Sequence, residues 1–161
     1  MLVDEKRQRA RSQPAADEQA AFSAWGAFLA AHAAVTARLD AALQERVGIS
    51  LGWYDVLVHV AAAPERRLRL RDLDQQVLIS QPTVSRLAAR MAAVGLLSRS
   101  TPEDDHRGVQ IALTGMGARR LRQARAVAIE VIRDTFAAAL TDEAAVRLHA
   151  QMIEIHRRAC G

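Results

Sequence analysis

The stretch SQPTVSRLAARMAAV, residues 80–94, decides the fold of this chain. At about 100° per residue, its apolar side chains fall within an arc of roughly 120°, which predicts the core-facing side of a helix. These side chains are Val84, Leu87, Ala88, Met91 and Val94. The opposite side carries amide, hydroxyl and guanidinium groups and no acid, so it suits the major groove of DNA, where a carboxylate would be repelled by phosphate. We therefore predict a DNA-recognition helix.

Length and composition limit the fold class and the location. The chain has 161 residues, of which 50% are hydrophobic and only 4% aromatic, which favours close-packed helices over a β-sandwich. The formal net charge of +4 permits a nucleic-acid partner without requiring one. The single cysteine, Cys160, excludes an intramolecular disulfide. We expect no signal peptide and no apolar run long enough to span a bilayer, and therefore a cytoplasmic protein with no membrane partner.

A long helix is predicted ahead of the recognition segment, in residues 14–48. Pro14 suits a first helical position, and Gly48 stands where a helix commonly ends. The apolar side chains of this helix occupy more than one face, which predicts burial against a second subunit. They include Phe22, Trp25, Leu29, Val35, Leu39 and Leu43. Residues 1–13 mix basic and acidic side chains without apolar periodicity, and we expect them to form a disordered basic arm.

The order of short elements around the recognition segment indicates a helix-turn-helix. Ser50 is expected to cap a helix that ends just before Pro64. Residues 71–77 then predict a short helix, and a tight break leads to Ser80, the expected N-cap of the recognition helix. A short helix, a tight turn and a second helix with a basic polar side are typical of DNA-binding helix-turn-helix proteins.

A hairpin is predicted directly after the recognition helix. Gly95 ends the helix, residues 96–100 read as a strand, and residues 101–108 read as a charged turn. A returning strand follows from the alternating apolar residues Val109, Ile111 and Leu113. This hairpin completes a winged helix, which we assign to residues 49–114. Thr114 and Thr141 are the expected N-caps of two further helices, in residues 115–161.

The segments LRDLDQQVLISQPTVSRLAARMAAVGLL (70–97) and PEDDHRGVQIALT (102–114) resemble the MarR family of bacterial transcription regulators. In that family a leucine-rich helix leads to an I-S-x-x-T-V-S-R-like recognition helix, then G-L, then a wing that carries D-x-R and ends in I-x-L-T. Asp105 and Arg107 match the D-x-R of the wing. The resemblance covers nearly the whole chain, because the long first helix and the two C-terminal helices look like the family's dimerisation elements.

The resemblance implies a mostly α-helical fold, in which long N- and C-terminal dimerisation helices flank a winged helix-turn-helix DNA-binding module. It also implies a homodimer on a pseudo-palindromic DNA operator, with one recognition helix in each of two successive major grooves. Arg107 would reach a minor groove, whose narrow, electronegative form suits arginine. An ordinary salt-bridged turn is the alternative. This wing is more acidic than is usual in the family, so either its acids order the loop or the recognition helix carries more of the binding.

The predicted DNA contacts lie on the recognition helix and the wing. For direct readout of bases we predict amide, hydroxyl and guanidinium side chains, because these pair with base edges: Gln81, Thr83, Ser85 and Arg86. Arg90 is expected at a phosphate. In the wing we predict contacts from His106 and Arg107, with Asp105 ordering the loop. A solvated polar surface is the alternative for the helix.

An effector site is implied by the resemblance alone. Family members typically hold a small aromatic or phenolic effector in a cleft between the dimerisation helices and the winged module, and its binding releases DNA. The candidates here are Trp25, His32, Trp53, Asp55 and His59. Packing is the alternative for the tryptophans, and ordinary hydrogen bonding for the histidines. Asp55 and Arg86 also resemble a pair found in urate-responsive members. The histidines lack metal-ligand spacing, and we expect no metal and no cofactor.

Catalysis is not expected, because the sequence has no glycine-rich phosphate loop, no nucleophile elbow and no His/Cys cluster. The predicted function is a homodimeric, sequence-specific DNA-binding transcriptional regulator, a repressor released by a small aromatic or phenolic effector. One alternative is a ligand-independent DNA-binding or architectural protein. Another is a winged-helix module for protein interaction.

Overall fold

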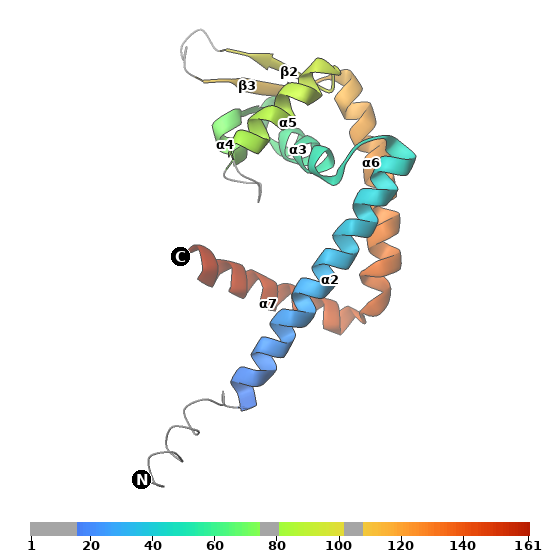
Figure 1. The fold of residues 1–161 in the computed structure, drawn as a ribbon, viewed down its shortest axis with the longest axis vertical. Helices are drawn as coiled ribbons and strands as arrows, with labels where there is room; N and C mark the ends of the chain where they lie inside the picture. Colours follow the sequence, from blue (N-terminus) through green and yellow to red (C-terminus); the bar gives the residue numbers. More distant parts are fainter. Residues whose placement is uncertain (1–15, 75–80, 102–107) are drawn as a thin grey trace, which may run out of the picture. The chain divides into compact units, whose positions relative to one another are not determined.

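The computed structural model describes residues 16–74, 81–101 and 108–161, and Figure 1 draws the other residues as a thin grey trace. The chain divides into two compact units, residues 1–37 and 38–161. Helix α2 (Ala16–Val47) belongs to both units. The second unit continues with α3 (Leu51–Ala62), a 3-10 turn (Pro64–Arg66), β1 (Arg67–Arg69), α4 (Leu70–Asp74), α5 (Gln81–Ala93), β2 (Leu97–Ser100), β3 (Gln110–Leu113), α6 (Gly115–Thr135), a second 3-10 turn (Ala137–Ala139) and α7 (Asp142–Cys160).

Helix α2 ends where the sequence predicts. Gly48 follows its last residue with a φ of +72°, a left-handed conformation that costs glycine little. Arg120 of α6 donates a hydrogen bond to the carbonyl oxygen of Val47, which has no partner within its own helix. The predicted start at Pro14 lies outside the described residues.

The first part of α2, in the first unit, is apolar and exposed. Four of its large side chains are between 43% and 57% exposed: Phe22, Trp25, Phe28 and Leu29. By length and composition alone, residues 18–47 could cross a membrane, with a mean hydropathy of 1.3 in the most apolar window. This corrects the expectation that no apolar run reaches that length. Much of this run consists of alanines, and each alanine is less hydrophobic than a large aliphatic residue.

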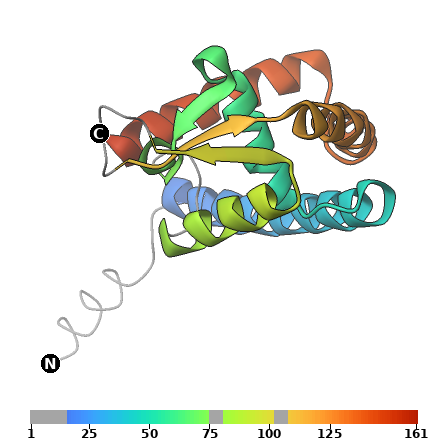
Figure 2. The same ribbon diagram turned by 90° about the horizontal axis from the view of Figure 1, so that it is seen from above.

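A three-stranded antiparallel sheet lies in the second unit, in the order β1–β3–β2. Leu68 pairs with Ile111 and Leu97 with Leu113, so these four side chains share one face of the sheet. Ile111 and Leu97 are buried on that face. Figure 2 shows β2 and β3 side by side, with β3 leading into α6. The two strands of the predicted wing are therefore present, although Val109 precedes β3 instead of belonging to it.

One hydrophobic core joins the last part of α2 to α3, α4, α5, the sheet and α6. Burying a leucine or valine side chain contributes roughly 1.5–3 kcal/mol to stability. The largest side chains that are fully buried are Leu43, Val56, Leu57, Val60, Leu73, Val84, Met91, Leu97 and Ile111. Because two of these belong to α5, the predicted recognition helix is fixed to the rest of the unit by its apolar side.

One detail of the predicted recognition helix is wrong. Val94 is 51% exposed and not in the core, because α5 ends at Ala93 and Gly95, with a φ of +76°, turns the chain toward β2. Helix α6 ends at Thr135, within the predicted helical region 115–161. Helix α7 repeats its apolar residues at helical spacing, and none of its residues, all of which the structure describes, is buried within the single chain.

An ion pair links α2 to α6 within the second unit. The Arg46 guanidinium donates two hydrogen bonds to the Glu130 carboxylate, at 2.8 and 2.9 Å. These bonds, and the opposite charge, hold the pKa of Glu130 below its usual value and raise that of Arg46. Both side chains are largely solvent-exposed, so the pair orients the two helices more than it stabilises them.

The junction between the wing and α6 brings two backbone segments close together. The Thr114 hydroxyl lies 2.7 Å from the carbonyl oxygen of Gly95 and 3.0 Å from that of Leu96. As the N-cap of α6 it also accepts a hydrogen bond from the backbone N–H of Gly117, at 2.9 Å. A Cβ atom on Gly117 would lie 2.1 Å from the Leu96 carbonyl oxygen, so only glycine fits there without movement.

Candidate nucleic-acid interface

Helix α5 turns its polar side outward because its apolar side is fixed in the core. Val84 and Met91 are fully buried, whereas Arg86 and Arg90 are exposed and Ser85 is half-buried. The helix contains no acidic residue, and within the described part of the chain neither arginine forms an ion pair. The outward side of α5 is therefore positively charged and free to meet an anion.

Several predicted DNA contacts lie beyond what the structure describes. Gln81 and Thr83 belong to the first turns of α5, but their side chains lie outside the described part. The wing residues Asp105, His106 and Arg107 also lie outside the described residues. For these five residues, contact with DNA or ordering of the wing stays a prediction.

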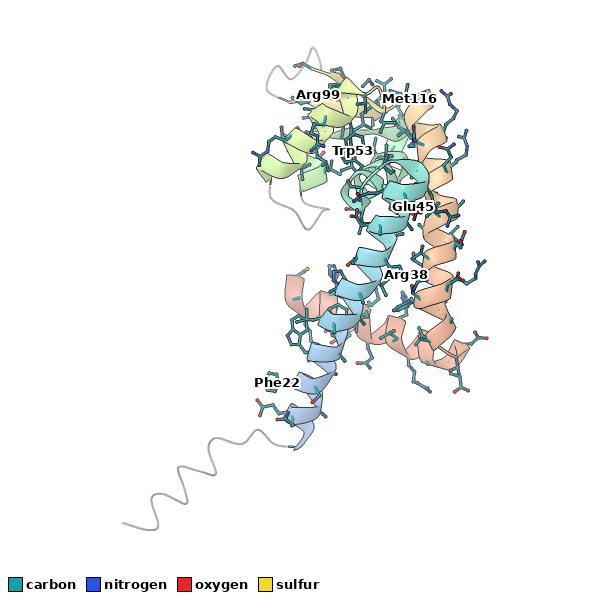
Figure 3. All side chains as sticks on the ribbon, turned by 45° about the vertical axis from the view of Figure 1, so that its right-hand side comes forward. Phe22, Arg38, Glu45, Trp53, Arg99 and Met116 are labelled. Atoms are coloured by element: carbon teal, nitrogen blue, oxygen red, sulfur yellow. The ribbon has the colours of Figure 1, made fainter. Side chains whose placement is uncertain are left out.

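A cleft lies beside Arg90, one of the two exposed arginines of α5. Its volume is about 390 Å³, and its lining comes from the end of α2, the start of α3 and the flank of α5: Gln44, Gly48, Ile49, Ser50, Trp53 and Arg90. The Arg90 guanidinium lies over the Trp53 ring, 5.8 Å from the ring centroid, a cation–π distance. Figure 3 labels Trp53 on α3. The cleft joins two residues that the sequence had assigned to different tasks, Trp53 to an effector and Arg90 to a phosphate.

The start of α3 holds Trp53 in place through two caps. The Ser50 hydroxyl accepts a hydrogen bond from the Trp53 backbone N–H at 3.3 Å, as the sequence predicts for an N-cap. The Asp40 carboxylate of α2 accepts a second one from the Leu51 backbone N–H at 2.6 Å. Asp40 lies eleven residues before Leu51, so helical periodicity in the sequence could not reveal this contact.

The comparisons with known proteins agree with this geometry. The sequence model of the MarR family matches residues 47–108. The structure of Sco3205, a MarR family transcriptional regulator from Streptomyces coelicolor in complex with DNA, is similar over 89% of each chain, with a TM-score of 0.80 and 28% identity. AbsC, another MarR family regulator from Streptomyces coelicolor, is similar over 91% of this chain and 98% of its own, with a TM-score of 0.78 and 26% identity. The chain belongs to the MarR family.

MarR-family membership confirms the winged helix-turn-helix fold predicted from the sequence, and it makes the chain a DNA-binding transcriptional regulator. A more distant regulator shares the fold. The organohalide-sensing regulator RdhR-CbdbA1625, in its 2,4-dichlorophenol-bound form, matches over 91% of this chain and 86% of its own, with a TM-score of 0.75 and 17% identity. No curated protein sequence matches the chain.

The residues predicted to bind an effector in this MarR-family chain fall into separate groups. In the first unit, Trp25 is exposed and stacks on Phe28, whose ring centroid lies 6.1 Å from that of His32. In the second unit, His59 Nε2 lies 3.4 Å from Asp55 Oδ1, one helical turn away on α3. The Asp55 carboxylate is therefore a local polar partner for His59. Trp53 contacts Arg90 instead of either of them.

Two further observations limit the chemistry of this MarR-family protein. Among the described residues, no group of three His, Cys, Asp or Glu side chains could hold a metal ion. Tyr54, which follows Trp53 on α3, has a pKa raised by partial burial, so its hydroxyl stays neutral over the physiological range.

The sequence did not identify Asp40 as a partner of α3. It also did not identify three residues that line the cleft, which are Gln44, Gly48 and Ile49.

Proposed function

We propose that this MarR-family regulator is a homodimeric repressor that binds a pseudo-palindromic operator. The two α5 helices read base edges in successive major grooves, through Arg86 and its neighbours. Arg90 contacts a phosphate, and His106 and Arg107 of a wing ordered by Asp105 reach the minor groove. The observation that carries the proposal is the outward side of α5, which bears two exposed arginines and no acid while the opposite side is fixed in the core. The remaining residues proposed for direct readout are Gln81, Thr83 and Ser85.

Residues 49–114 serve DNA binding in this proposal, residues 14–48 and 115–161 serve dimerisation, and residues 1–13 form a basic arm. Large exposed apolar side chains support the dimer, since soluble monomers rarely leave such surfaces uncovered. Covering α2 with a second copy also accounts for its apolar composition without a membrane, so we assign the protein to the cytoplasm. The exposed side chains are Phe22, Trp25, Phe28, Leu29, Ile129, Ile132, Phe136, Val146, Ile153 and Ile155.

Trp25→Glu is expected to convert the dimer to a monomer, because the dimer would bury an unpaired carboxylate in an apolar interface. Sedimentation velocity measures the change as a mass of one chain instead of two. Ser23→Glu is the matched control, since Ser23 lies on the opposite side of the same helix and should leave the dimer intact. A dimer that survives Trp25→Glu with an unchanged dissociation constant would contradict the assignment of α2 to the interface.

Release by a small aromatic or phenolic effector is the second part of the proposal. Its support is the set of aromatic and polar side chains on α2 and α3 and the phenol held by a protein of the same fold. The residues proposed for effector binding are Trp25 and His32 in the first unit, and Trp53, Asp55 and His59 in the second.

The effector is tested by measuring binding to the promoter of the protein's own operon by fluorescence anisotropy. We expect at least one compound of a panel of phenols and aromatic acids, 2,4-dichlorophenol and benzoate included, to raise the Kd about tenfold or more. Cyclohexanol is the non-aromatic control. If no aromatic compound changes the Kd, the ligand-independent DNA-binding or architectural protein becomes the better description.

A further inference from the structure

We propose that Trp53 is a positioning residue for DNA binding, which holds the Arg90 guanidinium at the edge of α5 so that it meets a phosphate of the DNA backbone. The inference rests on the proposed DNA contact of α5 and assigns Trp53 a task other than packing or effector binding. Three features of the second unit carry it: the contact between Trp53 and Arg90, the direction in which this contact draws Arg90, and the chemistry of the cleft that the two residues share.

The contact of Arg90 distinguishes it from Arg86. The two arginines lie one helical turn apart, and both are exposed. The Arg90 guanidinium lies 5.8 Å from the centre of the Trp53 ring, whereas Arg86 has no aromatic contact among the described residues. A stacked guanidinium has already lost part of its side-chain freedom, so it loses less on binding a phosphate than a free one would.

The two arginines occupy different positions around the axis of α5, and these positions suit different contacts with DNA. At 100° per residue, Arg90 is displaced by about 40° from Arg86 around the axis of α5. The contact with Trp53 shows that this displacement is toward α3. Arg86 therefore lies on the side of α5 that points farthest from the core, which is the side that enters the groove. Arg90 lies at the edge of that side, next to α3. The DNA backbone runs along the flanks of a helix seated in the major groove, where a guanidinium finds phosphate and not base edges.

The cleft beside Arg90 has the chemistry of a phosphate contact. Apart from backbone, its polar groups are the Gln44 amide, the Ser50 hydroxyl, the Arg90 guanidinium and the indole N–H of Trp53, and no carboxylate belongs to its lining. The nearby Asp40 carboxylate accepts hydrogen bonds from the Leu51 backbone N–H and from the Gln44 amide, so both of its oxygens have donors. Trp53 forms the apolar wall, and the caps at the start of α3 fix its backbone.

A double-mutant cycle on the full chain and an operator duplex tests the inference. Trp53→Leu is expected to weaken operator binding about two- to fivefold, the range of an exposed cation–π contact. Arg90→Gln should weaken it at least as much and reduce the slope of log Kd against log salt by about 0.9, one phosphate contact. In the Arg90→Gln background, Trp53→Leu should have no further effect, because the side chain that it positions is gone.

Arg86→Gln supplies the matched control, since it removes the other exposed arginine of α5 and has no contact with Trp53. Trp53→Leu should weaken binding by the same factor with or without Arg86→Gln. Trp53→Phe, which keeps a ring face, should recover most of the affinity. Trp53→Met, which also lacks a ring, replaces Trp53→Leu if circular dichroism shows that the leucine variant does not fold. An equal effect of the Trp53 substitution with and without Arg90 would mean a merely structural role and would overturn the inference.

Failure of this inference is distinguishable from failure of the proposed function. If wild-type protein shows no salt-dependent, sequence-specific binding, the proposed function is wrong and the inference falls with it. If Arg86→Gln weakens operator binding but Trp53 and Arg90 are not coupled, only the inference is wrong. A Trp53→Leu variant that binds the operator like wild type but no longer responds to an aromatic effector would also overturn it, and would return Trp53 to the effector site.

Discussion

Gly117→Ala is expected to lower the free energy of unfolding by about 3 kcal/mol, the upper part of the range for overpacking a well-packed site. The added Cβ atom would lie 2.1 Å from the Leu96 carbonyl oxygen and 2.9 Å from a methyl group of Leu113. The first of these is a backbone atom held by hydrogen bonds, so α6 must shift away from the wing. Thermal unfolding followed by circular dichroism should show a Tm lower by roughly 10 °C for a chain of this length.

Gly26→Ala is the matched control for this substitution. Gly26 lies inside α2, where an added Cβ atom would meet nothing within 4 Å. Alanine there should stabilise the helix by about 0.5–1 kcal/mol, the usual gain over glycine in a helix interior. The same change of residue is thus expected to act in opposite directions at the two positions. A Gly117→Ala protein with an unchanged or higher Tm would contradict the close approach of α6 to Leu96.

Arg86→Ala is expected to weaken binding to the operator at least tenfold and to reduce the preference for operator over unrelated DNA. An arginine that pairs with a guanine edge contributes about 1–3 kcal/mol of discrimination, and nothing else on the outermost line of α5 replaces it. Because Arg86 is exposed, and makes no ion pair within the described residues, its removal should leave the Tm nearly unchanged. Titration of labelled operator and of a scrambled duplex measures both effects.

Arg107→Ala provides the contrast. A wing arginine in the minor groove should weaken binding to operator and scrambled DNA alike, and it should flatten the salt dependence by about one phosphate contact. The two substitutions therefore separate readout of sequence from attachment to the backbone. Unchanged operator affinity in both variants would contradict the assignment of α5 and the wing to DNA.

Local signals in the sequence predicted the elements of the fold well. Ser50, Thr114 and Thr141 each accept a hydrogen bond from a backbone N–H three residues later, as N-caps do. Gly48 and Gly95 both have the positive φ expected after a helix. Capping and turn formation depend on residues that are close together in the chain, so a single sequence is enough to predict them.

Contacts between segments that are distant in the chain could not be predicted from the sequence. The bond from the Leu51 N–H to Asp40, the stacking of Arg90 on Trp53 and the approach of Gly117 to Leu96 each join different elements. Periodicity tells which side of a helix is apolar but not which residue of another helix it meets. For the same reason, the sequence assigned Trp53 and Arg90 separately, although they line one cleft.

The error at Val94 has a different cause. Its position fits the apolar side of α5 if the helix continues, but the helix ends at Ala93, and the turn at Gly95 carries Val94 into solvent. Helix ends are where a periodic pattern is least informative, because the rotation per residue changes there.

Selection of binding sites from random DNA by the full-length wild-type protein tests the central claim most directly. If a dimer places two α5 helices in successive major grooves, the selected sequences should share a palindrome whose half-sites are about one helical turn apart, roughly 10–10.5 base pairs from centre to centre. Selected sequences with no common motif, or with a single half-site and no symmetric partner, would contradict it.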